Sequence, residues 1–141
     1  MTMKAPVNPR LMNALPIHDS EFNAIEIQPD PSVYLKLCLV FTLHSDEQLE
    51  EVSKLGLTSR SLRLTFERCW QIASNILGTG SIRETIHNWN IVEASELLKR
   101  LKSHGFAKGV ELQHHRIEFS GGSSLDVLAE EVFIEQCESP S

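Results

Sequence analysis

Several kinds of residue and segment are scarce in this sequence, and each shortage excludes a class of protein. Aromatic residues make up 6% of the 141 residues, and they are not interleaved with basic residues as in single-strand nucleic-acid binders. The longest apolar run, Leu37 to Phe41, is too short to cross a bilayer. No apolar segment follows the basic residues near the N-terminus, so we expect no secretory signal. These shortages predict a cytoplasmic protein that binds neither membranes nor nucleic acid.

Local patterns for metal binding and catalysis are also missing. The three cysteines, Cys38, Cys69 and Cys137, form no CxxC pair, which is typical of reduced thiols in a cytosolic protein. The six histidines show neither HExxH nor zinc-finger spacing. No GxSxG elbow or phosphate-binding loop occurs. We therefore expect no metal, no cofactor and no catalytic residue, and interpret the chain as a non-enzymatic protein.

Acidic residues outnumber basic ones, 19 to 13, and the net charge is −6. This balance argues against a phosphate backbone as partner and favours association with a basic protein. The candidates for a partner-binding acidic surface lie in the last predicted strand and in a short predicted helix: Glu130, Glu131, Glu135, Asp46, Glu47, Glu50 and Glu51. For any one of these clusters, a solvated face that only keeps the protein soluble is the more common role.

Alternation of apolar and polar residues predicts the first strands. Every odd position from Val33 to Leu43 is apolar, which is typical of a strand with one buried face. A strand over Glu21 to Ile27 precedes it, and the Pro29 to Ser32 turn predicts a hairpin between the two. A third strand is expected from about Ser61 to Cys69. The segment Trp70 to Leu77 either extends that strand or begins a helix.

Two helices are expected. The segment Ser45 to Gly56 predicts a short helix, because Ser45 and Gln48 have the spacing of a capping box; a polar loop is the alternative. The main helix is expected over Ile91 to His104 with Asn90 as its N-cap, since apolar residues recur there at helical spacing. Residues 82–88 would add a preceding helical turn.

A final hairpin is predicted from Val110 to Phe119 and from Leu125 to Gln136, joined by the glycine-containing turn at 120–123. Apolar residues change from even to odd positions within the first of these strands, and from odd to even within the second. One extra residue reverses the alternation of a strand, so we predict a β-bulge or a bend near His114-His115 and another near Glu130-Glu131.

Together these elements predict an α+β fold. It consists of a curved antiparallel β-sheet of about five or six strands, packed by one main helix and a short second helix. Residues 1–10 are expected to be a flexible leader, residues 11–136 a single domain, and residues 137–141 a flexible tail.

The segment Ile17-His18-Asp19-Ser20 stands at the entrance to the first long strand. We interpret His18, Asp19 and Ser20 as a structural strand-entry motif, because Asp and Ser commonly bond nearby backbone N–H groups. His18 would pack against the sheet. A catalytic role is a weaker interpretation, since triads rarely assemble from sequence neighbours. Replacing His18 or Asp19 by alanine is expected to lower stability by about 1 kcal/mol.

The segment Leu15 to Phe22, followed by a hairpin, resembles the opening of a group of small bacterial proteins with a Leu/Ile-His-Asp-Ser/Ala motif. Those proteins also carry a hydrophobic-x-hydrophobic-x-Phe strand, matched here by Leu62 to Phe66, and end in a glycine-turn hairpin, matched by Ser120 to Gly122. Several are assigned as immunity proteins of polymorphic toxin systems. The resemblance implies a non-enzymatic protein that neutralises a cognate toxin, so the expected partner is another protein, such as a basic toxin domain.

Two other interpretations stay open. A curved sheet can enclose a pocket, and His114, His115 and Trp89 would line it in a small ligand-binding or enzymatic domain. An exposed edge strand permits self-association, and hence a homodimer.

Overall fold

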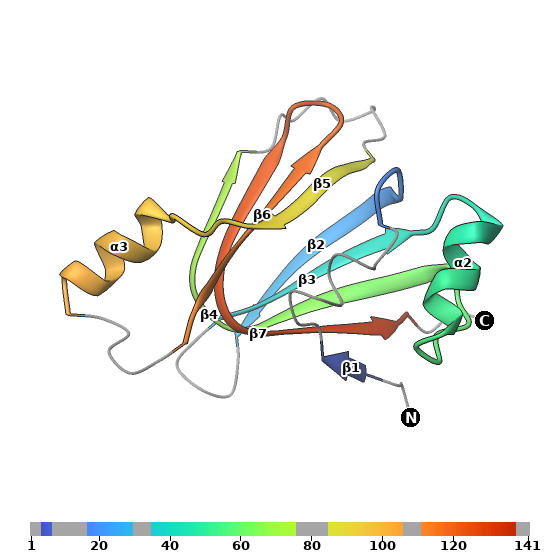
Figure 1. Ribbon diagram of the computed structural model, residues 1–141, viewed down its shortest axis with the longest axis horizontal. Coiled ribbons are helices and arrows are strands. Elements are labelled where there is room, and N and C mark those ends of the chain that lie inside the picture. The colour runs from blue at the N-terminus through green and yellow to red at the C-terminus, as the bar shows by residue number, and fades with distance from the viewer. Residues whose placement is uncertain (1–3, 7–16, 30–34, 76–84, 106–110, 138–141) are drawn as a thin grey trace.

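The computed structural model describes residues 4–6, 17–29, 35–75, 85–105 and 111–137 (Figure 1). Within them the fold is α+β with a curved antiparallel sheet, which confirms the expected fold class. The elements, in chain order, are β1 (Lys4–Pro6), β2 (Glu21–Pro29), β3 (Leu35–Thr42), α2 (Asp46–Ser53), β4 (Ser61–Asn75), β5 (Ile86–Ile91), α3 (Glu96–Ser103), β6 (Gln113–Phe119) and β7 (Ser124–Gln136). No helix in these ranges is long and apolar enough to cross a membrane.

The sheet consists of two halves that share its longest strands, β4 and β7. Its strand order is β2-β3-β4-β7-β6-β5, and β1 pairs with β7 off this path. The pairing of β3 with β4 involves only the first part of β4, up to Cys69. The pairing of β6 with β7 involves only the part of β7 from Ser124 to Ala129. The two halves therefore meet in the middle of the β4–β7 pair, where both strands curve (Figure 1).

The bend is built around Arg68, whose φ of 51° is left-handed. A register shift follows between Cys69 and Gln71, so Trp70 is an extra residue on β4. The Arg68 guanidinium pairs with Glu130 at 3.4 Å and with Glu131 at 2.8 Å. The irregularity predicted near Glu130-Glu131 is thus found within two residues of that position, with the extra residue on the partner strand.

The other predicted bulge, near His114-His115, is wrong. Strand β6 stays in unbroken register with β7 from Gln113 to Glu118. The apolar pattern changes parity because both faces of the strand are covered at this point. His114 lies against Ser95 on one face, and His115 lies against Trp89 on the other.

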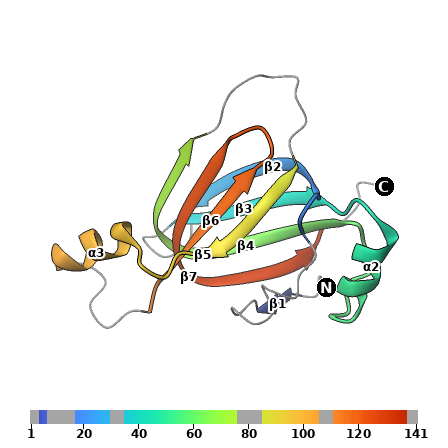
Figure 2. The same cartoon turned by 45° about the horizontal axis from the view of Figure 1, so that its top comes forward.

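The core lies between the two halves of the sheet, which fold toward each other. Figure 2 shows β5 crossing over the first half of β4, and the ring of Phe66 meets that of Trp89 at 6.3 Å. Phe22 and Phe119 pack at 4.9 Å near the other end of the core. Strand β7 supplies the largest share of buried residues from one element. In the strand predicted over Val33 to Leu43, the described odd positions are buried from Leu37 onward.

The short helix α2 confirms the expected capping box. The Ser45 hydroxyl accepts the Gln48 N–H at 3.3 Å, and the Gln48 side chain accepts the Ser45 N–H at 3.0 Å. The helix ends before Gly56, which has a φ of 85°. That conformation suits glycine because it has no Cβ.

The main helix is shorter than predicted. Its N-cap is Ser95 rather than Asn90, and Ile86–Ile91 is strand β5 rather than helix. Pairing with β6 buries Ile86 and Trp89, which outweighs the weak helical preference of the intervening residues. No α3 residue is buried, and Figure 1 shows this helix beyond the end of the sheet. The apolar face is therefore covered mainly by the other half of the sheet and not by the helix.

Two further expectations change in the described residues. Within the segment expected to be a leader, Lys4–Pro6 is strand β1, whose backbone pairs with β7 between Phe133 and Glu135. The ambiguous segment after Cys69 extends β4 as far as Asn75. The rest of the leader, the turn after Pro29, the end of the segment up to Leu77 and the last four residues of the tail lie outside the described residues.

The left-handed φ of Arg68 generates a prediction with an internal control. Both Arg68→Ala and Arg68→Gly remove the ion pairs to β7, but only glycine adopts this φ without a Cβ penalty. We expect the glycine variant to be the more stable of the two by about 1 kcal/mol, measured by urea unfolding.

The same two substitutions at Arg116, an exposed position of strand β6 without positive φ, supply the control. There glycine is expected to be less stable than alanine, because it has more freedom in the unfolded chain. If the alanine variant is more stable than the glycine variant at both positions, the proposed strain at Arg68 is contradicted.

Candidate functional site

The Ile17-His18-Asp19-Ser20 segment joins three elements. The Asp19 N–H donates to the Ile86 carbonyl at 2.8 Å, and the Ile86 N–H donates to the Ser20 carbonyl at 2.9 Å. A further β-bridge links Glu21 to Thr85, so the two ends of the strand order, β2 and β5, meet here. The Gln48 side-chain amide donates to the His18 carbonyl at 2.8 Å and ties α2 to the same turn.

The side chains of this segment divide between the core and the solvent. Ile17 and Ser20 are buried, while Asp19 holds a left-handed φ of 68°. His18 is not buried against the sheet: its side chain is 60% exposed, and its Nδ1 lies 3.1 Å from an Asp19 carboxylate oxygen. Its ring lies 5.6 Å from that of His87 on β5. The backbone of this segment makes the strand-entry contacts, and its two exposed side chains are left at the surface.

The seven candidate acidic residues are spread over three parts of the structure. Glu130 and Glu131 are at the bend, Glu135 is near the end of β7, and Asp46, Glu47, Glu50 and Glu51 are on α2. Five of the seven pair with cations, which reduces their net field: Glu130 and Glu131 with Arg68, Glu135 with Arg63, Asp46 with Arg60, and Glu51 with Lys54. Their role in binding a partner stays a prediction.

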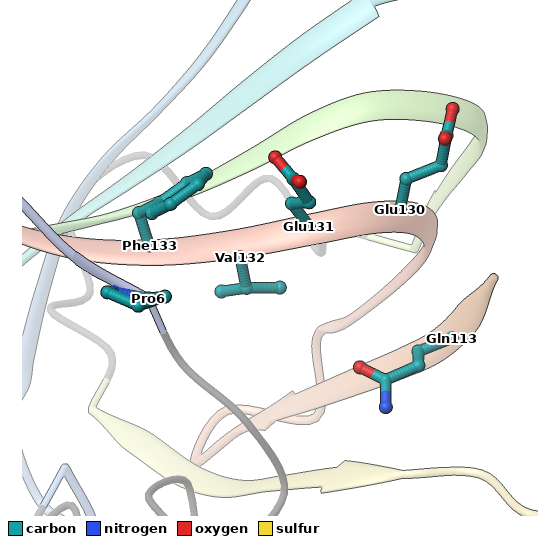
Figure 3. A pocket seen from close by; sticks show the side chains of 6 residues that line it. All are labelled: Pro6, Gln113, Glu130, Glu131, Val132 and Phe133. Atoms are coloured by element: carbon teal, nitrogen blue, oxygen red, sulfur yellow. The ribbon is translucent and has the colours of Figure 1, made fainter. Parts of the chain in front are cut away.

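A pocket of about 190 Å³ opens on the edge of β7 that faces away from β4 (Figure 3). Strand β6 begins at Gln113, opposite Ala129, and β1 ends at Pro6, opposite Phe133. Residues 130–132 lie between these two pairings. Figure 3 shows Glu130 and Glu131 directed to one side of β7 and Val132 to the other. The pocket is thus a gap in the sheet edge with a mixed polar and apolar lining.

His114 connects the start of α3 to the sheet. The Ser95 Oγ lies 2.6 Å from His114 Nδ1, and His114 Nε2 lies 2.6 Å from an Asp126 carboxylate oxygen. The Ser95 Oγ also accepts the Leu98 N–H as the N-cap of the helix. The contact between the serine and the histidine was not apparent from sequence, because Ser95 and His114 come from different elements.

This Ser–His–Asp chain contains the groups of a nucleophile–base pair but differs from a serine-protease triad. The serine lies at Nδ1 and the aspartate at Nε2, which is the reverse of the usual arrangement. Ser95 is only 3% exposed, and its oxygen already accepts a helix N–H. The arrangement therefore favours a structural link between helix and sheet.

His115 lies on the opposite face of β6, in the core. The Trp89 indole N–H donates to its Nδ1 at 3.1 Å, and the Phe66 ring packs edge-on at 5.2 Å. Burial, with a smaller contribution from neighbouring His114, lowers the pKa of His115 from 6.5 to about 4. The neutral ring is therefore part of the core at neutral pH.

The three residues proposed to line a ligand pocket are not brought together around one. Trp89 and His115 are packed in the core, and His114 is engaged with Ser95 and Asp126 on the other face. None of them lines the pocket at the β7 edge or a second pocket of about 360 Å³ beside α2. Among the described residues, no group of three or more His, Cys, Asp or Glu side chains is arranged to hold a metal ion.

The left-handed conformation of Asp19 leads to a more specific prediction of how substitutions in this segment affect stability. Asp19→Ala should lower the free energy of unfolding by about 1 kcal/mol, because alanine disfavours positive φ. Asp19→Asn should cost much less, since asparagine adopts this conformation readily. His18→Gln should change stability little, because the Gln48 amide bonds the backbone carbonyl of residue 18, which the substitution keeps. Chemical denaturation measures all three, and equal stability of the alanine and asparagine variants would contradict this role.

The buried His115 predicts a loss of stability in acid. The unfolded chain takes up a proton near pH 6.5, but the folded chain does so only near pH 4. Stability is therefore complete above pH 6.5 and falls as the pH drops toward 4, by about 3 kcal/mol from this group. Denaturation curves at several pH values should show a weaker dependence in His115→Gln. The exposed-site variant His44→Gln should keep the original dependence, and an unchanged slope in His115→Gln would refute the assignment.

No protein-family model matches the chain, and no curated protein matches its sequence.

Proposed function

We propose that the protein is a non-enzymatic protein-binding module, of the immunity type that the sequence resemblance implies. One observation carries the proposal. Ile27 and Leu35, 54% and 44% exposed, are the exposed large hydrophobic residues among the described part of the chain, and they lie at the same end of the β2–β3 hairpin.

Ile27 and Leu35 extend the apolar face of the sheet past the residues that are buried in the core. Ile27 pairs with Leu37, which is fully buried, and Leu35 pairs with Pro29 two residues further along. Directly paired residues lie on one face of a sheet, and so do residues two apart in a strand. The apolar inner face of the sheet therefore continues into solvent at this end, where it can contact a partner.

Strand β2 adds a second feature to this surface. It is the first strand in the sheet order, and among the described residues its outer edge is bridged only at Glu21, to Thr85. The backbone groups from Ala24 to Gln28 on that edge face no strand of the described chain. A partner that contacts Ile27 and Leu35 can also bond this edge, as in strand-addition complexes.

The alternative functions have less support. The pocket of about 190 Å³ is smaller than the roughly 300–1,000 Å³ usual for small-molecule sites. The pocket of about 360 Å³ beside α2 is lined by polar and acidic side chains, without the apolar lining that such sites have. The Ser95–His114–Asp126 chain has a structural explanation in the helix cap.

The test uses the protein encoded by the neighbouring gene, because toxin and immunity genes are expected to be adjacent. Its binding is measured by titration calorimetry with wild type, Ile27→Asp and Leu35→Asp. Placing a charge in an apolar contact removes about 1.5–3 kcal/mol of burial, so we expect at least tenfold weaker binding. The control is Gln71→Asp, which adds the same charge at an exposed position of β4.

Sedimentation of the protein alone distinguishes self-association. A dimer that Ile27→Asp dissociates would assign the surface to a second copy and would contradict the toxin-binding proposal. Binding of the neighbouring protein with unchanged affinity in both variants would place its interface elsewhere. Absence of binding by that protein would contradict the immunity function.

A further inference from the structure

We propose that His18 and His87 form a surface site for a divalent transition-metal ion such as Zn²⁺. The two rings lie 5.6 Å apart between centroids, and both side chains are exposed. They come from different elements, since His18 precedes β2 and His87 is on β5. The site lies where these two edge strands of the sheet meet.

The separation of the rings fits a shared ligand. A zinc ion lies about 2.0–2.1 Å from an imidazole nitrogen, in the direction of that nitrogen's lone pair. With a tetrahedral angle at the metal, this bond length separates two ring centroids by about 5.2 Å. The observed 5.6 Å is close to that value. In the proposed site, one nitrogen of each ring would point toward the common ion.

Asp19 supports the same arrangement. Its carboxylate lies 3.1 Å from His18 Nδ1, so that nitrogen carries the proton and Nε2 is the nitrogen available to a metal. A carboxylate behind a ligating histidine fixes the ring and increases its basicity. The described residues contain no set of three converging ligands, so two imidazoles and water would complete the coordination.

The backbone around the two histidines is already held in place. The bonds between Asp19 and Ile86 and between Ile86 and Ser20 fix the strand ends next to both side chains. A bound ion would therefore clamp the corner at which the sheet closes. It would stabilise the folded state by an amount that grows with the logarithm of the ion concentration above the Kd. Imidazole ligands favour zinc, copper or nickel over magnesium and calcium. This inference does not depend on the proposed binding of a protein partner.

The test measures Zn²⁺ binding to tag-free protein by titration calorimetry, with the thermal midpoint as a second readout. We expect one ion per chain and a raised midpoint for wild type, and no effect of Mg²⁺. His18→Gln and His87→Gln should each weaken binding at least tenfold. Asp19→Asn should weaken it less, because it keeps the turn but loses the carboxylate charge.

The matched control is His44→Gln, which removes an exposed histidine beside α2. It should bind Zn²⁺ as wild type does. Unchanged binding in the double variant His18→Gln/His87→Gln would overturn the proposal by placing the ion elsewhere, and so would the absence of binding by wild type. None of these substitutions removes a backbone group that bonds in the turn. The thermal midpoint of each variant without metal shows separately whether a loss of binding is caused by unfolding.

Discussion

The shared bend of β4 and β7 is the constraint on which the rest of the structure depends. Both strands continue from one half of the sheet into the other, and Arg68 takes up a left-handed conformation between them. Its ion pairs to Glu130 and Glu131 hold the two strands together at that point. Because the halves turn toward each other, the core forms between them (Figure 1). Of the two described helices, α2 contributes Val52 to this core, and α3 contributes no buried residue.

The folding of the sheet brings its two outermost strands to one corner. The Ile17 to Ser20 segment bonds β5 through backbone groups and α2 through Gln48. The motif that the sequence resemblance singled out thus lies at the closure of the sheet. The same closure leaves β2 with an exposed edge and leaves Ile27 and Leu35 in solvent, which is the basis of the proposed protein-binding surface.

Features with a local cause were predictable. The alternation from Val33 to Leu43 predicted a strand with one buried face, and Ser45 with Gln48 predicted the helix cap. The Ile86–Ile91 strand was missed because its stability comes from pairing with β6, which lies far along the chain. The same reason applies to Lys4–Pro6, a strand only through its contact with β7. The parity change at His114-His115 was attributed to a bulge, since a strand covered on both faces gives the same pattern.

By itself the sequence determined the α+β class, most of the strands, the capped short helix and the glycine-containing turn at 120–123, because alternation, capping and turn chemistry act between near neighbours. It also indicated Asp19 and Ser20 as turn residues. Only the tertiary structure decided that the sheet folds over itself, that five of the seven candidate carboxylates are paired, and that His18 meets His87. Those outcomes depend on which distant strands lie side by side, and no local pattern encodes that choice.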